Sequence, residues 1–123
     1  MQKRILIAED DTNILISLEF LMRQAGHDIR TAINGQDALN IAREFRPHLV
    51  LLDIMLPLKN GFEVCEAMRA LPELAGMNII MLSAKGRDSE IAKGYALGAD
   101  AYITKPFATR ELTDTVQRLL EAG

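Results

Sequence analysis

Three short runs of consecutive apolar residues do most to limit how this chain can fold. They lie at residues 5–8, 49–52 and 79–82. Runs of this length without polar alternation are typical of strands buried on both faces, as in parallel sheets covered by helices. Residues 28–33 alternate polar and apolar side chains like a half-exposed edge strand, and residues 101–104 form a short fifth candidate. The sequence therefore predicts a parallel sheet whose first, third and fourth strands are internal.

A segment with helical spacing of apolar residues follows each of these strands. We expect Thr12 to cap the first helix and Gly26 to end it, and the second helix to stop before Pro47. Residues 72–77 are expected to form a loop, and residues 88–97 the fourth helix. The apolar positions that mark the five helices are, in chain order, Ile14, Leu18, Leu21 and Ala25; Ala38, Leu39, Ile41, Ala42 and Phe45; Val64, Cys65, Met68 and Leu71; Ile91, Ala92, Tyr95 and Ala96; and Leu112, Val116, Leu119 and Leu120. Five strand–helix repeats with strands two and five at the edges predict a flavodoxin-like (βα)5 three-layer α/β sandwich, with strand order 2-1-3-4-5.

Length and composition narrow the class of protein further. The 123 residues fit one domain, residues 1–123, with one core. A formal net charge of -3 argues against direct nucleic-acid binding, and the single cysteine, Cys65, excludes an internal disulfide. The apolar stretch behind Met1 reaches only Ala8, too short for a signal peptide, and no segment approaches the length of a membrane span. We therefore expect a cytoplasmic protein that does not associate with membranes.

Polar side chains stand at four strand ends: Glu9 and Asp10 after the first, Asp53 at the third, Ser83 at the fourth and Lys105 after the fifth. In the predicted strand order, ligands bind outside the carboxyl ends, where strands one and three meet. Oxygen ligands without a nearby His or Cys favour Mg2+ over zinc. With the metal and Lys105 neutralising charge, Asp53 could attack phosphorus and form an aspartyl phosphate. The pattern predicts a site for phosphoryl transfer.

Six short motifs, in order along essentially the whole chain, carry a resemblance to a known family. They are Glu9-Asp10, residues 51–57, Asn60-Gly61, Ser83-Ala84-Lys85, Gly98-Ala99-Asp100 and Lys105-Pro106-Phe107. Together they resemble the response-regulator receiver domain, the CheY-like family of two-component signalling. The resemblance implies a signalling phosphoacceptor that catalyses only its own phosphorylation and dephosphorylation. Its phosphodonor would be a sensor histidine kinase or a phosphotransfer protein, and its target an unidentified output partner or fused output domain.

The same resemblance implies how the acids act. Asp53 would accept the phosphoryl group from a phosphohistidine. Asp10 and Asp53 would bind Mg2+ directly together with the Met55 carbonyl. Glu9, which replaces the commoner Asp, would act mainly through water.

The remaining roles belong to the fourth and fifth strands. Ser83 and Lys105 would each bond a phosphoryl oxygen. Tyr102 occupies the family's aromatic switch position, expected to turn inward when Ser83 moves toward the phosphate. The change would then reach the face made by the fourth helix, fifth strand and fifth helix. The Lys105-Pro106 bond is expected to be cis, which would aim the lysine into the site.

Two pairs of positions bear on the oligomeric state and on the lifetime of the phosphoryl group. Ala101 and Thr115 stand where the winged-helix transcription-factor subfamily usually has the Asp and Arg that close its dimer, so we expect a monomer or weak dimer. Met55 and Lys85 lie two residues after the acceptor and two after the hydroxyl. There they could overhang the phosphorus, obstruct in-line attack by water and slow loss of the phosphoryl group.

Two other functions match parts of this pattern, and we reject both. A flavin-binding electron carrier has the same sheet order, but the acids after the first strand would repel flavin phosphate and the chain has no tryptophan to stack on the ring. A phosphohydrolase with an Asp nucleophile usually has a second acid where this chain has Met55, and a cap for which there is no room. Elsewhere, Cys65 and Met68 are expected in the core, His27 on the surface and His48 without a function.

Overall fold

Five parallel strands form one sheet in the order β2-β1-β3-β4-β5, as predicted, in a computed structural model that describes residues 2–84 and 86–122. Lys85 lies outside the described residues. The strands are β1 (Arg4–Ala8), β2 (Asp28–Ala32), β3 (Leu49–Asp53), β4 (Asn78–Ser83) and β5 (Ala101–Thr104). The helices are α1 (Thr12–Gln24), α2 (Gly35–Phe45), α3 (Gly61–Ala70), the 3-10 helix η1 (Pro72–Leu74), α4 (Asp88–Ala96) and α5 (Thr109–Ala122).

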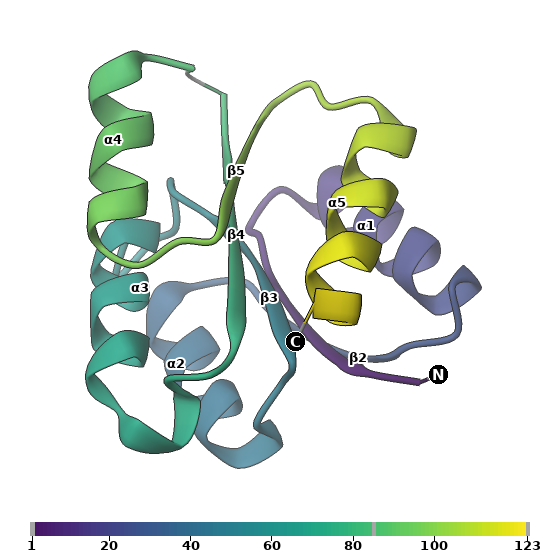
Figure 1. The fold of residues 1–123 in the computed structure, drawn as a ribbon, viewed down its shortest axis with the longest axis horizontal. Helices are drawn as coiled ribbons and strands as arrows, with labels where there is room; N and C mark the ends of the chain where they lie inside the picture. Colours follow the sequence, from purple (N-terminus) through teal and green to yellow (C-terminus); the bar gives the residue numbers. More distant parts are fainter. Residues whose placement is uncertain (1, 85, 123) are drawn as a thin grey trace.

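Helices cover both faces of this sheet, with α2, α3 and α4 on one side and α1 and α5 on the other (Figure 1). Successive residues of an internal strand point to opposite faces. Thus Val50 and Leu52 pack in the core under α2 and α3, whereas Leu49 and Leu51 pack in the core under α1 and α5. All residues of β3 are buried, while the edge strand β2 exposes Asp28 and Arg30 and buries Ile29 and Ala32, so that its alternation holds only as far as Arg30. The predicted internal and edge strands are confirmed.

Two local predictions are wrong. Asp11, not Thr12, caps α1: its Oδ1 accepts hydrogen bonds from the N–H groups of Asn13 and Ile14, at 3.0 and 3.2 Å. Asp11 has the extended backbone that an N-cap requires, whereas Thr12 is already helical. The segment 72–77 is also not simply a loop, since it begins with η1. Proline is favoured in the first turn of such a helix, because its missing N–H would have no partner there.

The start of β1 is held by two histidines whose structural role the sequence did not reveal. His27 Nδ1 accepts a hydrogen bond from the Lys3 N–H at 3.2 Å, and His48 Nδ1 accepts one from the Arg4 N–H at 3.0 Å. His27, expected on the surface, is in fact partly buried. Each ring precedes a strand that flanks β1, so each can reach a backbone donor that the sheet leaves unpaired.

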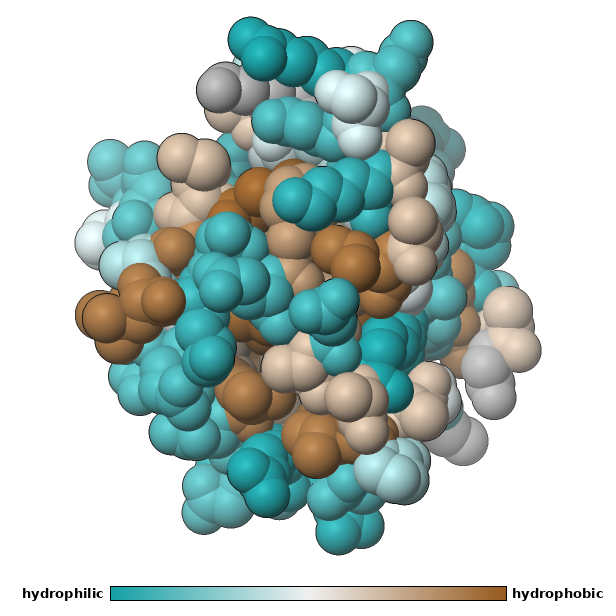
Figure 2. Space-filling view, turned by 90° about the vertical axis from the view of Figure 1, so that its left-hand side faces the viewer, coloured by the Kyte–Doolittle hydropathy of each residue, from teal (hydrophilic) through white to brown (hydrophobic). Residues whose placement is uncertain are grey.

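The outer surface gives two further observations. On the face that carries α2, α3 and α4, apolar residues are interspersed with hydrophilic ones (Figure 2). Among the described residues, no helix combines the length and the apolar character needed to cross a membrane.

Candidate functional site

The carboxyl ends of β1 and β3 bring three acids together at one edge of the sheet. One carboxylate oxygen from each of Glu9, Asp10 and Asp53 lies within 4.8 Å of the others. Glu9 and Asp53 are buried, with exposed fractions of 0% and 3%, whereas Asp10 is exposed. The predicted convergence is confirmed, and it leaves one side of the cluster open to solvent.

Lys105 lies beside this cluster, on the segment that follows β5. Its Nζ is 2.5 Å from Glu9 Oε1 and 3.3 Å from Asp53 Oδ1. Its backbone N–H donates to the Ser83 carbonyl at 2.6 Å, and the Lys105-Pro106 bond is cis, as expected. The lysine therefore bridges the two buried carboxylates, and its shorter contact is with Glu9.

Burial and charge act in opposite directions on this ion pair. Burial raises the pKa of Glu9, and the negative charge of Asp53 adds to the effect, although the hydrogen bond from Lys105 partly offsets both. Burial alone would lower the pKa of Lys105. The hydrogen bond to Glu9 and the charge of Asp53 outweigh it, so the pKa of Lys105 is raised. The lysine is thus held as a cation between two acids.

Glycine at position 61 lets α3 begin directly against the end of β3. A Cβ there would lie 2.5 Å from the Asp53 carbonyl oxygen and 2.7 Å from Ile54 Cα, closer than real Cβ atoms approach. The Gly61 N–H donates to the Ile54 carbonyl at 2.8 Å, and Asn60 caps α3 in a capping box with Glu63. The Asn60-Gly61 motif thus shapes the loop that follows the candidate acceptor.

Backbone contacts also orient the Asp53 side chain. Asp53 Oδ1 accepts a hydrogen bond from the Met55 N–H at 3.3 Å, and the Ile54 N–H donates to the Leu82 carbonyl at 3.0 Å. The Met55 side chain is 71% exposed. The loop after β3 therefore starts as an extension of the sheet and then presents Met55 at the surface.

Ser83 and Tyr102 lie on neighbouring strands between the acids and α4. Ser83 is buried at the end of β4, where it pairs with Thr104, and Tyr102 pairs with Met81. The Tyr102 ring packs against α4 so closely that a Cβ on Gly94 would lie 3.4 Å from Tyr102 Cδ2. Ser83 therefore lies at the carboxyl end of β4, and Tyr102 lies on the neighbouring strand against α4.

Sequence reasoning did not single out two exposed apolar residues at this end of the sheet. Ile33, in the loop after β2, is 58% exposed and Leu58, in the loop after β3, is 79% exposed. The two loops touch, because the Gly35 N–H donates to the Pro57 carbonyl at 3.0 Å. The sequence offered little signal for either residue, because Ile33 continues the alternation of the predicted edge strand and Leu58 follows other apolar residues.

The acid cluster has the donor chemistry of a Mg2+ site. All three side chains offer hard carboxylate oxygens, and no His or Cys belongs to the cluster. Magnesium takes few protein ligands and keeps several waters, which suits a cluster with one exposed member. Three acids so close together repel one another, and Lys105 supplies a single positive charge. The residues present therefore fit this ion.

A flavodoxin-like sheet whose carboxyl edge carries buried acids and a lysine defines the receiver class of α/β domains. Residues 5–117 match the family described as "Response regulator receiver domain". The chain belongs to this family, the receiver domains of two-component response regulators.

Solved structures with the same fold agree with this membership. A putative response regulator from Chloroflexus aurantiacus J-10-fl is 32% identical, covers 98% of this chain and 99% of its own, and superposes with a TM-score of 0.93. The chemotaxis response regulator CheY4 of Vibrio cholerae is 28% identical, with coverage of 97% and 99% and a TM-score of 0.91. The BeF3-activated DrrB receiver domain is 36% identical, with coverage of 98% and 99% and a TM-score of 0.89.

Proposed function

We propose that Asp53 accepts a phosphoryl group from the phosphohistidine of a sensor histidine kinase or phosphotransfer protein. The observation that carries the proposal is the meeting of Glu9, Asp10, Asp53 and Lys105 at one edge of the sheet. Asp53 is the member that ends β3, the central and fully buried strand of the sheet, and it lies within 4.8 Å of the other acids and 3.3 Å from the lysine. The chain would act as a signalling phosphoacceptor that catalyses only its own phosphorylation and dephosphorylation.

In the transfer, a carboxylate oxygen of Asp53 forms a bond to phosphorus while the N–P bond of the donor breaks. The electron pair of the broken bond stays on the donor imidazole. Bound Mg2+, held by Asp10, Asp53 and the Met55 carbonyl with Glu9 acting through water, would neutralise charge on the transferred group. Lys105 would bond one phosphoryl oxygen, and the Ser83 hydroxyl another.

The Glu9–Lys105 contact adds a positioning role to this scheme. At 2.5 Å it keeps the lysine close to Asp53 before any phosphoryl group arrives. An ammonium group already held beside the acceptor needs little reorganisation when charge develops on phosphorus. We infer that Glu9 orients Lys105 as well as supporting the metal.

The output would be a shift in the population of α4 conformations. Of the nine residues of α4, only Gly94 is buried, and the N-cap, Arg87, makes no side-chain capping bond. The neighbouring helix α3 has four buried residues and a capping box. A weakly anchored helix is cheap to rearrange, and Ser83 and Tyr102 connect it to the phosphate. The affected face would be α4, β5 and α5, which would contact an output partner or domain.

The phosphodonor would dock over the exposed apolar side chains beside the acids. Ile16 and Phe20 are four residues apart on α1 and are 59% and 63% exposed. Such spacing places both on one face of the helix. Ile33 and Leu58 add exposed apolar side chains in the loops after β2 and β3, at the same end of the sheet as the acids, and exposed apolar residues of this kind suit a protein partner. Composition and length further predict a cytoplasmic location, a single domain over residues 1–123 and no direct binding of nucleic acid; these remain predictions.

The decisive test is to map the phosphorylated residue. The protein is incubated with acetyl phosphate and Mg2+, and the hydroxylamine-labile adduct is located by peptide mass spectrometry. We expect modification at Asp53, none in Asp53→Asn, and full modification in Asp28→Asn, a matched control at the opposite end of the sheet. A label that survives Asp53→Asn would refute the assignment.

A second test concerns the output. DrrB is a receiver domain that was activated with BeF3, and the same reagent can be added to this protein with Mg2+. Hydrogen exchange should then change in α4 and β5 as well as in the loops at the carboxyl ends of the strands. Protection confined to those loops would contradict the population shift.

A further inference from the structure

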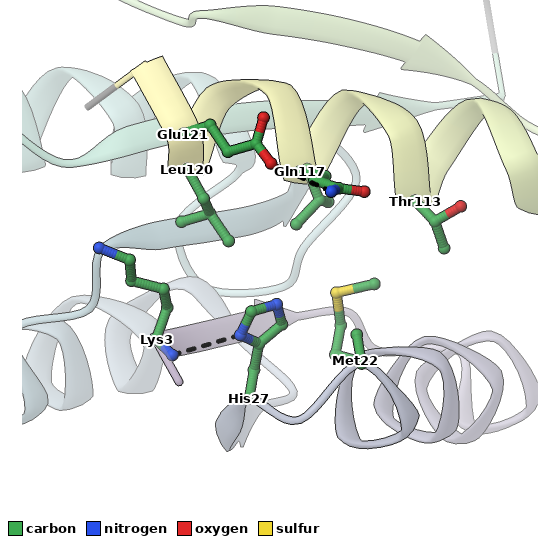
Figure 3. Close-up of a pocket in the computed structure, with 9 residues that line it drawn as sticks. Lys3, Met22, His27, Thr113, Gln117, Leu120 and Glu121 are labelled. Atoms are coloured by element: carbon green, nitrogen blue, oxygen red, sulfur yellow. Dashed lines mark hydrogen bonds between the residues drawn. The ribbon is translucent and has the colours of Figure 1, made fainter. Parts of the chain in front are cut away.

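A cavity separates the end of α5 from the end of α1, at the edge of the sheet opposite to Asp53. Its volume is about 530 Å³. Its apolar lining includes Met22 of α1 and Val116 and Leu120 of α5, all buried. Figure 3 shows Leu120 pointing from α5 toward the strand and helix below, where Met22 and His27 point back toward α5. The cavity is therefore a cleft between two helices that cover the same face of the sheet, with an apolar floor and polar side chains around it that include the acid Glu121.

A second cavity, of about 310 Å³, adjoins the first, because Lys3 and Leu120 line both. Its lining is rich in cationic groups: besides Lys3 it includes Arg4 and Arg46, and Glu73 is its one acid among the described residues. The pair of cavities thus combines a part with an apolar floor and a part rich in cations. Lys3 stands between them.

Part of this positive charge is already used by the fold. Arg4 donates to the carbonyls of Phe45 and Arg46 at the C-terminal end of α2, with distances of 2.8 to 3.0 Å. Cations are favourable there because the helix end carries partial negative charge. By contrast, neither the Lys3 ammonium nor the Arg46 guanidinium forms an ion pair with any residue in 2–84 or 86–122. Two cations therefore remain available to a ligand.

His48 offers one more donor in the charged part. Its Nδ1 accepts the bond from the Arg4 N–H, so the neutral ring carries its hydrogen on Nε2. Burial, followed by the charges of Arg4 and Lys3, lowers the pKa of His48 and keeps the ring neutral near pH 7. The groups around the charged cavity are thus donors that suit an anionic oxygen.

We propose that the two cavities form one binding site for a small amphipathic organic anion. Its apolar body would lie between α1 and α5 against Met22, Val116 and Leu120, and its carboxylate or phosphate would bind Lys3 and Arg46. Both volumes are within or close to the range typical of small-molecule sites, roughly 300 to 1,000 Å³, and such sites pair an apolar lining with a few polar groups. The site uses none of the residues proposed for phosphorylation, so either proposal can fail without the other.

The test uses octanoate as the probe, with octyl phosphate and neutral 1-octanol as comparisons. Octanoate is titrated into the isotope-labelled protein, and amide chemical shifts are followed by NMR. We expect saturable shifts near Lys3, Val116 and Leu120, and far weaker binding of 1-octanol. The ratio of octyl phosphate to octanoate affinity identifies which head group the site prefers.

Two variants and a control locate the site. Lys3→Gln should weaken octanoate binding by about tenfold or more, the effect of losing one hydrogen bond to a charged group. Gln117→Phe, at an exposed position lining the apolar cavity, should block the body of the ligand. Lys59→Gln makes the same charge change in the loop after β3 and should bind like the unmodified protein. Equal affinity for octanoate and 1-octanol, an unchanged affinity in Lys3→Gln, or shifts that do not saturate would each overturn the proposal.

Discussion

Replacing Asp10 by Asn should stabilise the metal-free protein and weaken its response to Mg2+. Asp10 has a carboxylate oxygen within 4.8 Å of one on Glu9 and one on Asp53. Two unit charges at that distance repel by about 0.9 kcal/mol at the dielectric constant of water, the appropriate value for an exposed group. The two pairs together give about 2 kcal/mol. Lys105, which forms no ion pair with Asp10 within the described part of the chain, offsets some of this. We expect a net gain of about 1 kcal/mol.

The effect of Mg2+ should run the other way. The metal stabilises the folded state in proportion to the logarithm of its concentration over its dissociation constant. Loss of one charged ligand should weaken Mg2+ binding, and each tenfold loss removes about 1.4 kcal/mol of that stabilisation. Asp10→Asn should therefore be more stable than the parent protein in EDTA and gain less stability when Mg2+ is added.

Urea unfolding in EDTA and in a series of Mg2+ concentrations measures both quantities. Asp28→Asn is the matched control, because Asp28 is exposed at the amino end of β2. Asp28→Asn should change the stability in EDTA by less than Asp10→Asn does. It should leave the dependence of stability on Mg2+ unchanged. A less stable Asp10→Asn protein in EDTA, or an undiminished gain with Mg2+, would show that the acids do not repel one another as their positions imply.

Three further outcomes are expected. The folded-state pKa of His48 is lowered from its ordinary value of 6.5. The contribution of His48 to the free energy of unfolding should therefore be complete above pH 6.5 and decrease as the pH drops below that value, because the unfolded state then binds more protons. Urea unfolding across this range should show a shallower decline for His48→Gln, and an equal decline would exclude His48 as the cause. Phosphate release should be faster in Met55→Asn and Lys85→Glu than in the parent protein at matched Mg2+, and unchanged rates would refute shielding of the phosphorus. Sedimentation of the phosphorylated protein at micromolar concentration should show a monomer or weak dimer, because Ala101 and Thr115 cannot form the subfamily's ion pair; a tight symmetric dimer would contradict this.

The internal strands were predictable because a run of consecutive apolar residues indicates a strand buried on both faces. β4 runs from Asn78 to Ser83, the bounds that its apolar run and flanking polar residues indicate. The start of α1 was less predictable, since Asp11 and Thr12 are both good N-cap residues. Which of them caps the helix depends on backbone angles, and Asp11 has the extended conformation. The side-chain chemistry shows which residue types can cap a helix, but it does not decide between two suitable neighbours such as Asp11 and Thr12.

For the candidate site, the sequence was enough to identify which groups meet. Parallel strands place their carboxyl ends at one edge, so Glu9, Asp10, Asp53 and Lys105 had to converge once the strand order was known. The tertiary structure alone decided that Lys105 lies closer to Glu9, at 2.5 Å, than to Asp53, at 3.3 Å. It also decided that His48 binds the backbone of β1, and that a cleft remains between α1 and α5. These features join residues far apart in the chain, and their distances depend on how side chains pack, which no local pattern specifies.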